Sequence, residues 1–269
     1  MLSTWYDSFG MQYTPPVLHI SQSPSAQVVE LGANSWRLEI AASPRRFYRL
    51  AQLDDYTRLP RSEFRWKPPV TLRLQARVSS QNLPGTWGFG IWNDPFSFLL
   101  GSDRQMKRFP TLPDAAWFFH ASPQNYLSFR DDLAACGFLA ATFSSRKVPT
   151  ALLALASPVL GLTLLPWTAQ LVRRVLRRQV RQTSSSIDLD VTGWHTYTLE
   201  WEDGQVRFSQ EGIKLLRTDI APHPPLSLVI WIDNQYAALP PRGRLKYGTL
   251  PNPEPAWMEV RQIEVVDNT

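Results

Sequence analysis

The sequence contains a single cysteine, Cys136, and only four histidines in 269 residues. One cysteine excludes an intrachain disulfide, so no disulfide framework holds the fold. The histidines are scattered and show none of the spacings of a metal site, and we expect no metal ligands among them. The sequence also lacks a phosphate-binding glycine loop, a G-x-S-x-G motif and a Cys/His pair, which excludes the enzyme classes that depend on those motifs.

Charged residues are also scarce, at 19% of the chain, while hydrophobic residues make up 43%. The hydrophobic fraction is enough for a sizeable core, and the length favours one large domain. The formal net charge is +5, and residues 168–181 alone contain five arginines and no acid. The positive excess is therefore local, and the rest of the chain is near neutral.

The N-terminal residues, MLSTWYDSFG, contain neither the basic nor the apolar segment of a secretory signal. If Met1 is the native start, we expect a cytoplasmic protein, attached peripherally (monotopically) to the cytoplasmic face of a membrane.

An uncharged run covers residues 148–167 and reaches the length of a membrane span. Pro149, Pro158, Gly161 and Pro166 break it into pieces that are too short to cross. Basic residues lie at both of its ends, which favours both ends staying on one side of a bilayer. The run is therefore predicted to dip into a membrane surface or to cover an apolar site as a lid.

The arginine-rich stretch after this run has two distinct halves when residues 171–181 are placed on a helix. One half holds Leu171, Val172, Val175, Leu176 and Val180, and the other holds Arg173, Arg174, Arg177, Arg178 and Arg181. An apolar half opposite a purely basic one is typical of an interfacial helix on anionic lipid. A surface helix with solvated arginines is the alternative. Nucleic acid is less favoured, because no base-stacking motif accompanies the arginines.

The rest of the chain shows the period-two alternation of β-strands. In VTLRLQARVSS, Val70, Leu72 and Leu74 share one side of the strand, and similar short segments recur between turns. TWGFGIW carries Gly88 and Gly90 inside a strand, which marks a close approach to the backbone. We therefore predict one all-β domain over residues 1–269, an antiparallel jelly-roll β-sandwich with a helical insert at 145–186.

Four segments carry a family resemblance: GTWGFGIW, WHTYTLEWEDGQVRFSQEG, LSLVIWIDN and WMEVRQIEVV. They resemble core strands of the concanavalin A-like lectin/glucanase superfamily, most nearly the family 16 glycoside hydrolases, over about residues 70–100 and 187–266. The resemblance implies a concanavalin A-like jelly roll, and with it glycan binding or hydrolysis. It names no cofactor; a structural calcium ion is compatible with this fold, but no ligands for one stand out.

The chain departs from this family at its catalytic motif. The family carries two glutamates in E-x-D-x-E, whereas the corresponding stretch here, DAAWFFHAS, has no glutamate, and the motif occurs nowhere in the sequence. Retaining hydrolysis needs two carboxyl groups about 5 Å apart. The standard family 16 mechanism is therefore not expected.

The remaining candidate residues follow from the rule that every second residue of a strand faces the same side. Trp92 and Asp94 lie on one side of their strand, and Trp231 and Asp233 on one side of theirs, so we expect two tryptophans on the floor of a concave cleft and two acids facing each other at one end. Such a pair would raise the pKa of at least one acid. The candidate catalytic residues are Asp94, Asp233 and His120, and the candidate ligand-binding residues are Trp87, Trp92, Trp117 and Trp231. The alternative is that both aspartates cap turns and His120 packs in the core.

The sequence thus favours a membrane-surface protein that binds, or acts on, a lipophilic or glycan-bearing lipid ligand in an aromatic cleft. An anionic membrane surface or lipid is the expected partner, together with a small lipophilic or carbohydrate ligand. An inactive lectin-like module, an enzyme that uses Asp94 and Asp233, and a glycoside hydrolase with displaced carboxylates remain open.

Overall fold

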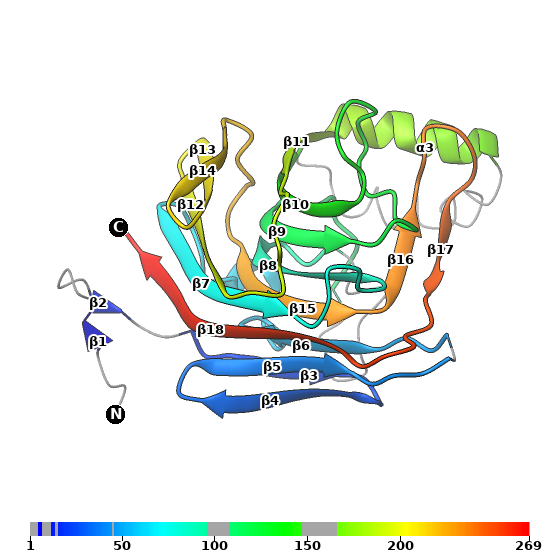
Figure 1. Ribbon diagram of the computed structural model, residues 1–269. Helices are drawn as coiled ribbons and strands as arrows, with labels where there is room; N and C mark the ends of the chain where they lie inside the picture. The colour runs from blue at the N-terminus through cyan, green and yellow to red at the C-terminus, as the bar shows by residue number, and fades with distance from the viewer. Residues whose placement is uncertain are drawn as a thin grey trace.

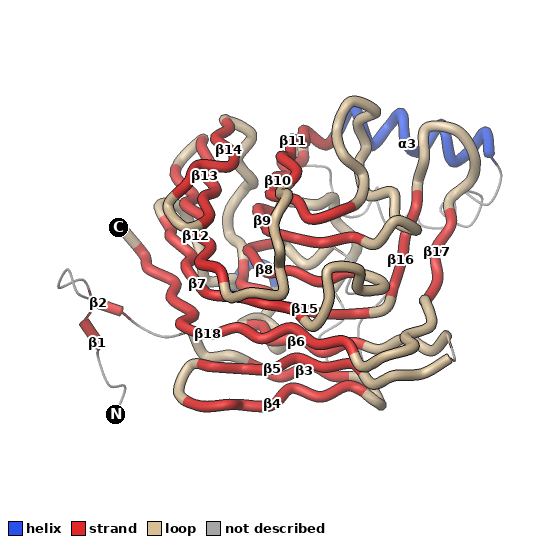
Figure 2. Tube along the Cα trace, viewed as in Figure 1, coloured by secondary structure: helices blue, strands red, loops and turns tan. Residues whose placement is uncertain are grey.

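The computed structural model describes residues 5–6, 12–13, 16–44, 46–95, 108–146 and 166–268, and most of them form two antiparallel β-sheets (Figures 1 and 2). The first sheet contains β3 (His19–Gln22), β6 (Leu50–Asp54), β8 (Thr86–Trp92), β9 (Ala115–Ala121), β10 (Gly137–Ser145), β11 (Val180–Ser186) and β15 (Ser227–Asp233). The second contains β4 (Ala26–Gly32), β5 (Ser35–Ile40), β7 (Val70–Val78), β12 (His195–Glu202), β13 (Gln205–Gln210), β14 (Ile213–Thr218) and β18 (Ala256–Asp267).

The strand orders are β11–β10–β9–β8–β15–β6–β3 in the first sheet and β14–β13–β12–β7–β18–β5–β4 in the second. Two small strand pairs, β1 (Trp5–Tyr6) with β2 (Gln12–Tyr13) and β16 (Gln235–Ala238) with β17 (Lys246–Thr249), lie outside them, and η1 (Arg61–Glu63) is one short 3₁₀ turn. The predicted all-β antiparallel sandwich is confirmed. The segments before and after the arginine-rich stretch also share both sheets, as predicted.

The second sheet follows the predicted alternation closely. Along β7, every second residue from Val70 to Val78 is buried against the first sheet, and the residues between them are more exposed. Strand β12 alternates in the same way and is joined to β13 by a hairpin in which Glu202 pairs with Gln205. One apolar face per strand is what a sheet with a solvated outer side requires.

The central strands of the first sheet are buried on both faces instead. All seven residues of β9 are buried, as are eight of the nine in β10. One face of these strands packs on the second sheet through side chains such as Phe89, Phe118 and Ile230. The other face packs aromatic and small side chains under loops, including Trp117, Phe119 and Phe143. The first sheet therefore carries an apolar layer on each side.

Gly88 and Gly90 explain how β8 fits between its neighbours. A Cβ atom on Gly88 would lie 2.4 Å from the carbonyl oxygen of Phe118, and one on Gly90 would lie 2.6 Å from the Cβ atom of Trp117. The predicted close approach is therefore that of the neighbouring strand β9. The missing side chains leave room for the larger ones beside them.

The predicted helical insert is shorter than 145–186. Strand β10 continues to Ser145, helix α3 (Pro166–Gln179) ends before Val180, and residues 180–186 form β11, which pairs with β10. Arg181 is therefore on a strand, and the extension of the helix to residue 181 was wrong. The apolar run up to residue 165 lies outside the described residues. Within the described part, no helix combines the length and hydropathy that crossing a bilayer requires.

Helix α3 lies beside β11 and the loop that follows β16 (Figure 1). Its most buried charged side chain is Arg173, which was predicted to face lipid with the other arginines. Arg173 instead points into the protein and donates hydrogen bonds to the carbonyl oxygens of Ser128 and Leu239, at 2.6 and 2.7 Å. Because burying a guanidinium is favourable only with such partners, Arg173 anchors the helix.

We predict that Gly88→Ala and Gly90→Ala each lower the free energy of unfolding by about 1–3 kcal/mol, because the added methyl group overlaps β9. Gly32→Ala is the matched control, because nothing lies within 4 Å of a Cβ atom there. Urea unfolding measures all three variants. Equal stability of the Gly88 and Gly32 variants would contradict the close approach.

Candidate functional site

The face of the first sheet that points away from the second sheet carries a cluster of aromatic side chains, and we call it the aromatic face. Strand pairing places Gly88 between Trp231 and Phe119, and Gly90 between Val229 and Trp117. The rings of Trp117 and Trp231 meet with their centroids 5.5 Å apart. The small residues of β8 thus give these side chains space to meet.

Trp92 and Trp231 form the accessible part of the aromatic face. Their rings are nearly parallel, 5° apart, with centroids separated by 6.4 Å, and both side chains are half-buried. Trp117 is buried and lies tilted against each of them, at 5.8 and 5.5 Å. Three of the four tryptophans that the sequence singled out therefore come together. Their role in binding a ligand stays a prediction.

Trp87 and His120 lie on the opposite side of the first sheet. Trp87 is 1% exposed and stacks on His120 at 5.5 Å and on Phe138 at 4.8 Å, inside the core between the sheets. Burial lowers the pKa of His120 to about 4, so its imidazole is neutral at neutral pH. The assignments of Trp87 to a ligand and of His120 to catalysis are therefore corrected, because strand parity turns both side chains away from the aromatic face.

Asp94 and Asp233 lie at opposite ends of the aromatic face. Strands β8 and β15 are antiparallel, so that Trp92 pairs with Ser227 and Thr86 pairs with Asp233. Asp94 lies two residues beyond Trp92. At about 3.3 Å per residue, the length of β8 between Thr86 and Trp92 alone separates the two acids by about 20 Å or more. The prediction that they face each other was wrong. Neither geometry of glycoside hydrolysis, with carboxyl groups about 5–9.5 Å apart, is available to this pair.

Asp94 is occupied by a buried ion pair. Its Oδ2 atom accepts a hydrogen bond from Arg108 Nη1 at 2.6 Å, and both side chains are nearly inaccessible. Arg108 also donates to the carbonyl oxygens of Tyr56 and Leu59. The pair therefore ties the end of β8 to the segment that follows β6.

Asp233 holds one of the tryptophans through a threonine. Trp231 Nε1 donates to Thr86 Oγ1 at 2.9 Å, and Thr86 Oγ1 in turn donates to Asp233 Oδ1 at 2.9 Å. The backbone N–H groups of Thr86 and Gln235 also donate to Asp233. Burial raises the pKa of Asp233 to about 7, and these hydrogen bonds oppose the rise. Asp233 thus positions Trp231.

Polar residues of β6 border the aromatic face and were not singled out from the sequence. Gln52 pairs with Trp231, and Asp54 pairs with Val229. Gln52 Nε2 donates to Asp54 Oδ2 at 2.9 Å, and Asp54 also accepts hydrogen bonds from the backbone and side chain of Thr57. Gln52 and Asp54 are two residues apart in the otherwise apolar strand LAQLD, so they share one side of it. This spacing was the signal in the sequence that could have identified them.

Strand β9 contains AAWFFHA, the stretch that the resemblance would align with the family's catalytic motif. On the aromatic face it presents Ala115, Trp117, Phe119 and Ala121, and no acid. Among the described residues, no group of three or more His, Cys, Asp or Glu side chains could hold a metal ion. Strand β9 thus gives the aromatic face contact area and no acid, and the described acid at its border, Asp54, is fully buried.

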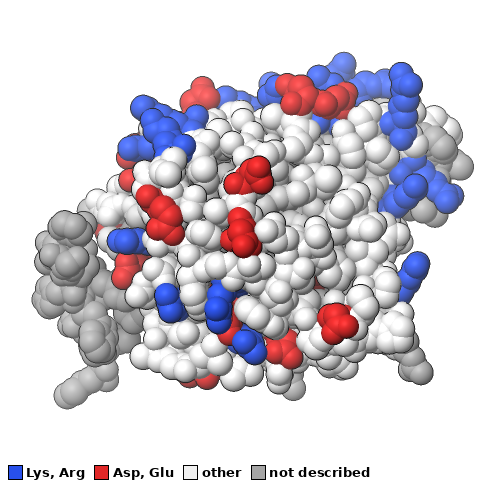
Figure 3. All heavy atoms as spheres, in the orientation of Figure 1, with Lys and Arg blue, Asp and Glu red and all other residues white. Residues whose placement is uncertain are grey.

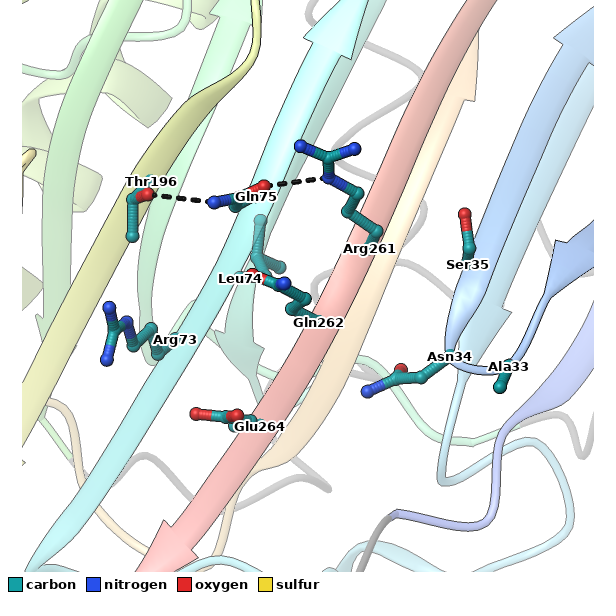
Figure 4. A pocket seen from close by; sticks show the side chains of 10 residues that line it. All are labelled: Ala33, Asn34, Ser35, Arg73, Leu74, Gln75, Thr196, Arg261, Gln262 and Glu264. Carbon is teal, nitrogen blue, oxygen red and sulfur yellow. Dashed lines mark hydrogen bonds between the residues drawn. The ribbon is translucent and has the colours of Figure 1, made fainter. Parts of the chain in front are cut away.

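A hollow lies on the outer side of the second sheet, where Thr196, Gln75 and Arg261 are joined by hydrogen bonds across three strands (Figure 4). The neighbouring tryptophan, Trp194, already has the guanidinium groups of Arg77 and Arg261 over its ring, at 4.8 and 4.1 Å from the centroid. Cations occupy the ring surface that a ligand would need. The aromatic face is therefore the stronger candidate site.

Comparisons with known proteins give similarity in structure only. No protein-family model and no curated protein sequence matches the chain. The catalytic domain of LamA from Zobellia galactanivorans is similar over 93% of this chain and 90% of its own, at 13% identity and a TM-score of 0.47. The pseudo β-1,3-glucanase of Mycobacterium tuberculosis is similar over 87% of this chain and 75% of its own, at 11% identity and a TM-score of 0.45.

A third similar structure is the binding domain of botulinum neurotoxin DC in complex with SialylT. The similarity covers 97% of the present chain but only 46% of the neurotoxin chain, at 7% identity and a TM-score of 0.44. These similarities concern the arrangement of strands alone, so the site has to be judged on its own geometry.

We predict that Asp233 makes the protein more stable at pH 5 than at pH 8. Between about pH 4 and pH 7 the folded protein keeps a proton that the unfolded chain has lost, so the free energy of unfolding falls as the pH rises through this window. Asparagine cannot ionise. The loss in free energy of unfolding that Asp233→Asn causes relative to the parent should therefore be smaller at pH 8 than at pH 5, by on the order of 2–4 kcal/mol.

Urea unfolding of the parent and the Asp233→Asn variant at both pH values measures this difference. Asp219→Asn is the control, because that carboxylate is 87% exposed. A cost of Asp233→Asn that is the same at pH 5 and pH 8 would mean that Asp233 is ionised throughout.

We also predict that the buried pair is structural. Asp94→Asn should cost about 3 kcal/mol, and a double-mutant cycle with Arg108→Gln should show that the two changes are coupled. Asp132→Asn, which removes an exposed partner of Arg130, should have little effect. Additive changes at Asp94 and Arg108 would contradict the assignment.

Proposed function

We propose that this protein is a lectin-like module that binds a carbohydrate on the aromatic face without hydrolysing it. The observation that carries the proposal is the parallel, half-buried pair Trp92 and Trp231. One side of a pyranose ring is rich in C–H groups, which carry partial positive charge. The face of an indole ring is electron-rich, so the two surfaces attract each other, and burying both is favourable. Two parallel indoles suit adjacent sugar rings.

Polar groups beside Trp231 supply the hydrogen bonds that such a site needs. Thr86 and Gln235 are both half-buried, and both are fixed by Asp233. A few placed polar groups within an aromatic surface are the usual make-up of a specific ligand site. Asp233 supports this site from below by orienting Thr86.

Binding without hydrolysis follows from where the carboxyl groups lie. Strand β9 presents no acid to the aromatic face, Asp94 is paired with Arg108, and Asp233 lies at the far end. A hydrolase with displaced carboxylates would need two accessible acids, whereas Asp54, the described acid at the border of the aromatic face, is fully buried and hydrogen-bonded to Gln52 and Thr57. The geometry therefore favours the inactive lectin-like module over both enzyme hypotheses.

We propose further that the carbohydrate is carried at a membrane surface, with the protein attached peripherally. The support is helix α3, which contributes four of the five arginines and is tied to the aromatic face. Arg173 bonds to the loop between β9 and β10 at Ser128, and Leu127 and Phe129 of the same loop pack against the aromatic cluster. A surface that holds α3 would thus hold the aromatic face near it.

We predict that Trp92→Ala and Trp231→Ala each weaken carbohydrate binding about tenfold or more, which corresponds to about 1.4 kcal/mol. Immobilised glycans, including laminari-oligosaccharides and sialylated glycans, provide the screen, and chromatography of the incubated oligosaccharide tests for products. Trp257→Ala, at a half-buried tryptophan of the second sheet, is the matched control and should bind as the parent does. Parent-like affinity of both aromatic-face variants, or release of shorter oligosaccharides, would contradict the proposal.

A further inference from the structure

Helix α3 is attached to the protein by its polar and small residues. Thr168, Ala169 and Arg173 are the buried residues of the helix. Besides its bonds to backbone carbonyls, Arg173 donates to Asp131 Oδ1 at 2.6 Å and lies over the ring of Tyr126. An amphipathic surface helix usually does the opposite and packs its apolar stripe on the core.

Three large apolar residues of α3 point outward instead, while Val172 and Leu176 are half-buried. Trp167, Leu171 and Val175 are 66%, 47% and 49% exposed. They are spaced by four, so they form one continuous stripe along the helix. Because the inner side is fixed by Arg173, a rotation that buries the stripe would break the buried guanidinium contacts. A contiguous apolar stripe on a well-anchored helix marks a contact surface.

Arginines border this stripe. Arg174, Arg177 and Arg178 are exposed on the helix, and Arg181 is exposed where β11 begins. Figure 3 shows Lys and Arg atoms gathered at the upper right of the view, where α3 lies in Figure 1. Within the described chain, Arg177 approaches Asp131 at 3.4 Å and Arg181 approaches Asp219 at 3.9 Å, while Arg174 and Arg178 have no ion-pair partner. The arginines beside the stripe therefore favour an anionic partner.

We infer that the outward side of α3 docks on an anionic phospholipid bilayer with the helix axis along the surface. Trp167, Leu171 and Val175 enter the boundary between headgroups and acyl chains, and the bordering arginines contact lipid phosphates. This deepens the proposed membrane setting and rests on it, but it does not depend on carbohydrate binding.

Other occupants fit this surface less well. A second copy that paired through the same side of α3 would bring two rows of arginines together, and like charges repel. A nucleic acid would satisfy the arginines but leave the stripe of Trp167, Leu171 and Val175 in water. A bilayer provides both an apolar layer and a layer of negative charge.

Flotation of the full chain with glycan-free vesicles tests the inference. Vesicles of phosphatidylcholine alone are compared with vesicles that contain about 30% phosphatidylserine, at low and high salt. We expect the parent to float with the anionic vesicles and to lose binding as salt rises. Arg174→Gln with Arg178→Gln should weaken binding about 30-fold, and Leu171→Gln with Val175→Gln should weaken it at both salt concentrations.

The matched control is Ile213→Gln with Arg217→Gln, which changes an exposed apolar residue and an exposed arginine on β14 and should float as the parent does. Trp92→Ala should also float as the parent does, which separates a failure of carbohydrate binding from a failure of docking. The inference is overturned if the α3 variants float as well as the parent or if neutral vesicles bind equally. It is also overturned if the parent does not float but forms dimers or binds duplex DNA through the same arginines.

Discussion

The close approach of β8 to β9 at Gly88 and Gly90 is the contact on which the aromatic face depends. Because these positions have no side chains, the rings of Trp117 and Trp231 meet across β8, and Trp92 completes the cluster. The same strand sends Trp87, Phe89 and Ile91 into the core on its other side. One strand thus supports both apolar layers of the first sheet, which is why its geometry allows little variation.

Much of the fold could be predicted from the sequence, because half-buried strands carry a period-two pattern that reports their exposure directly. Strand β7 and the β12–β13 hairpin are examples. The pattern is lost where both faces are buried, so β9 and β10 read only as apolar runs. The end of α3 could not be placed either, since Val180 suits a helix as well as a strand until its pairing with Ser145 on β10 is known.

For the candidate site, the sequence predicts which side of its strand each residue faces, but not how the strands are arranged. Parity placed Trp92 and Trp231 on one face, but it does not state which way neighbouring strands run, and the antiparallel pairing of β8 and β15 sends Asp94 and Asp233 to opposite ends. On α3 the sequence indicated an outward apolar stripe, and Leu171 and Val175 are exposed. It did not single out Arg173 among the arginines, because the backbone carbonyls that bury this guanidinium belong to loops distant in the sequence.

The central claim is that the aromatic face binds a carbohydrate without hydrolysing it, and NMR of the indole N–H groups tests it most directly. The chain has eleven tryptophans, whose indole signals can be assigned and followed during titration with the best-bound oligosaccharide. The account predicts that the signals of Trp92 and Trp231 shift, that those of Trp194 and Trp257 stay in place, and that the sugar's reducing-end signal does not grow. Shifts confined to Trp194 and Trp257, or growth of the reducing-end signal, would contradict it.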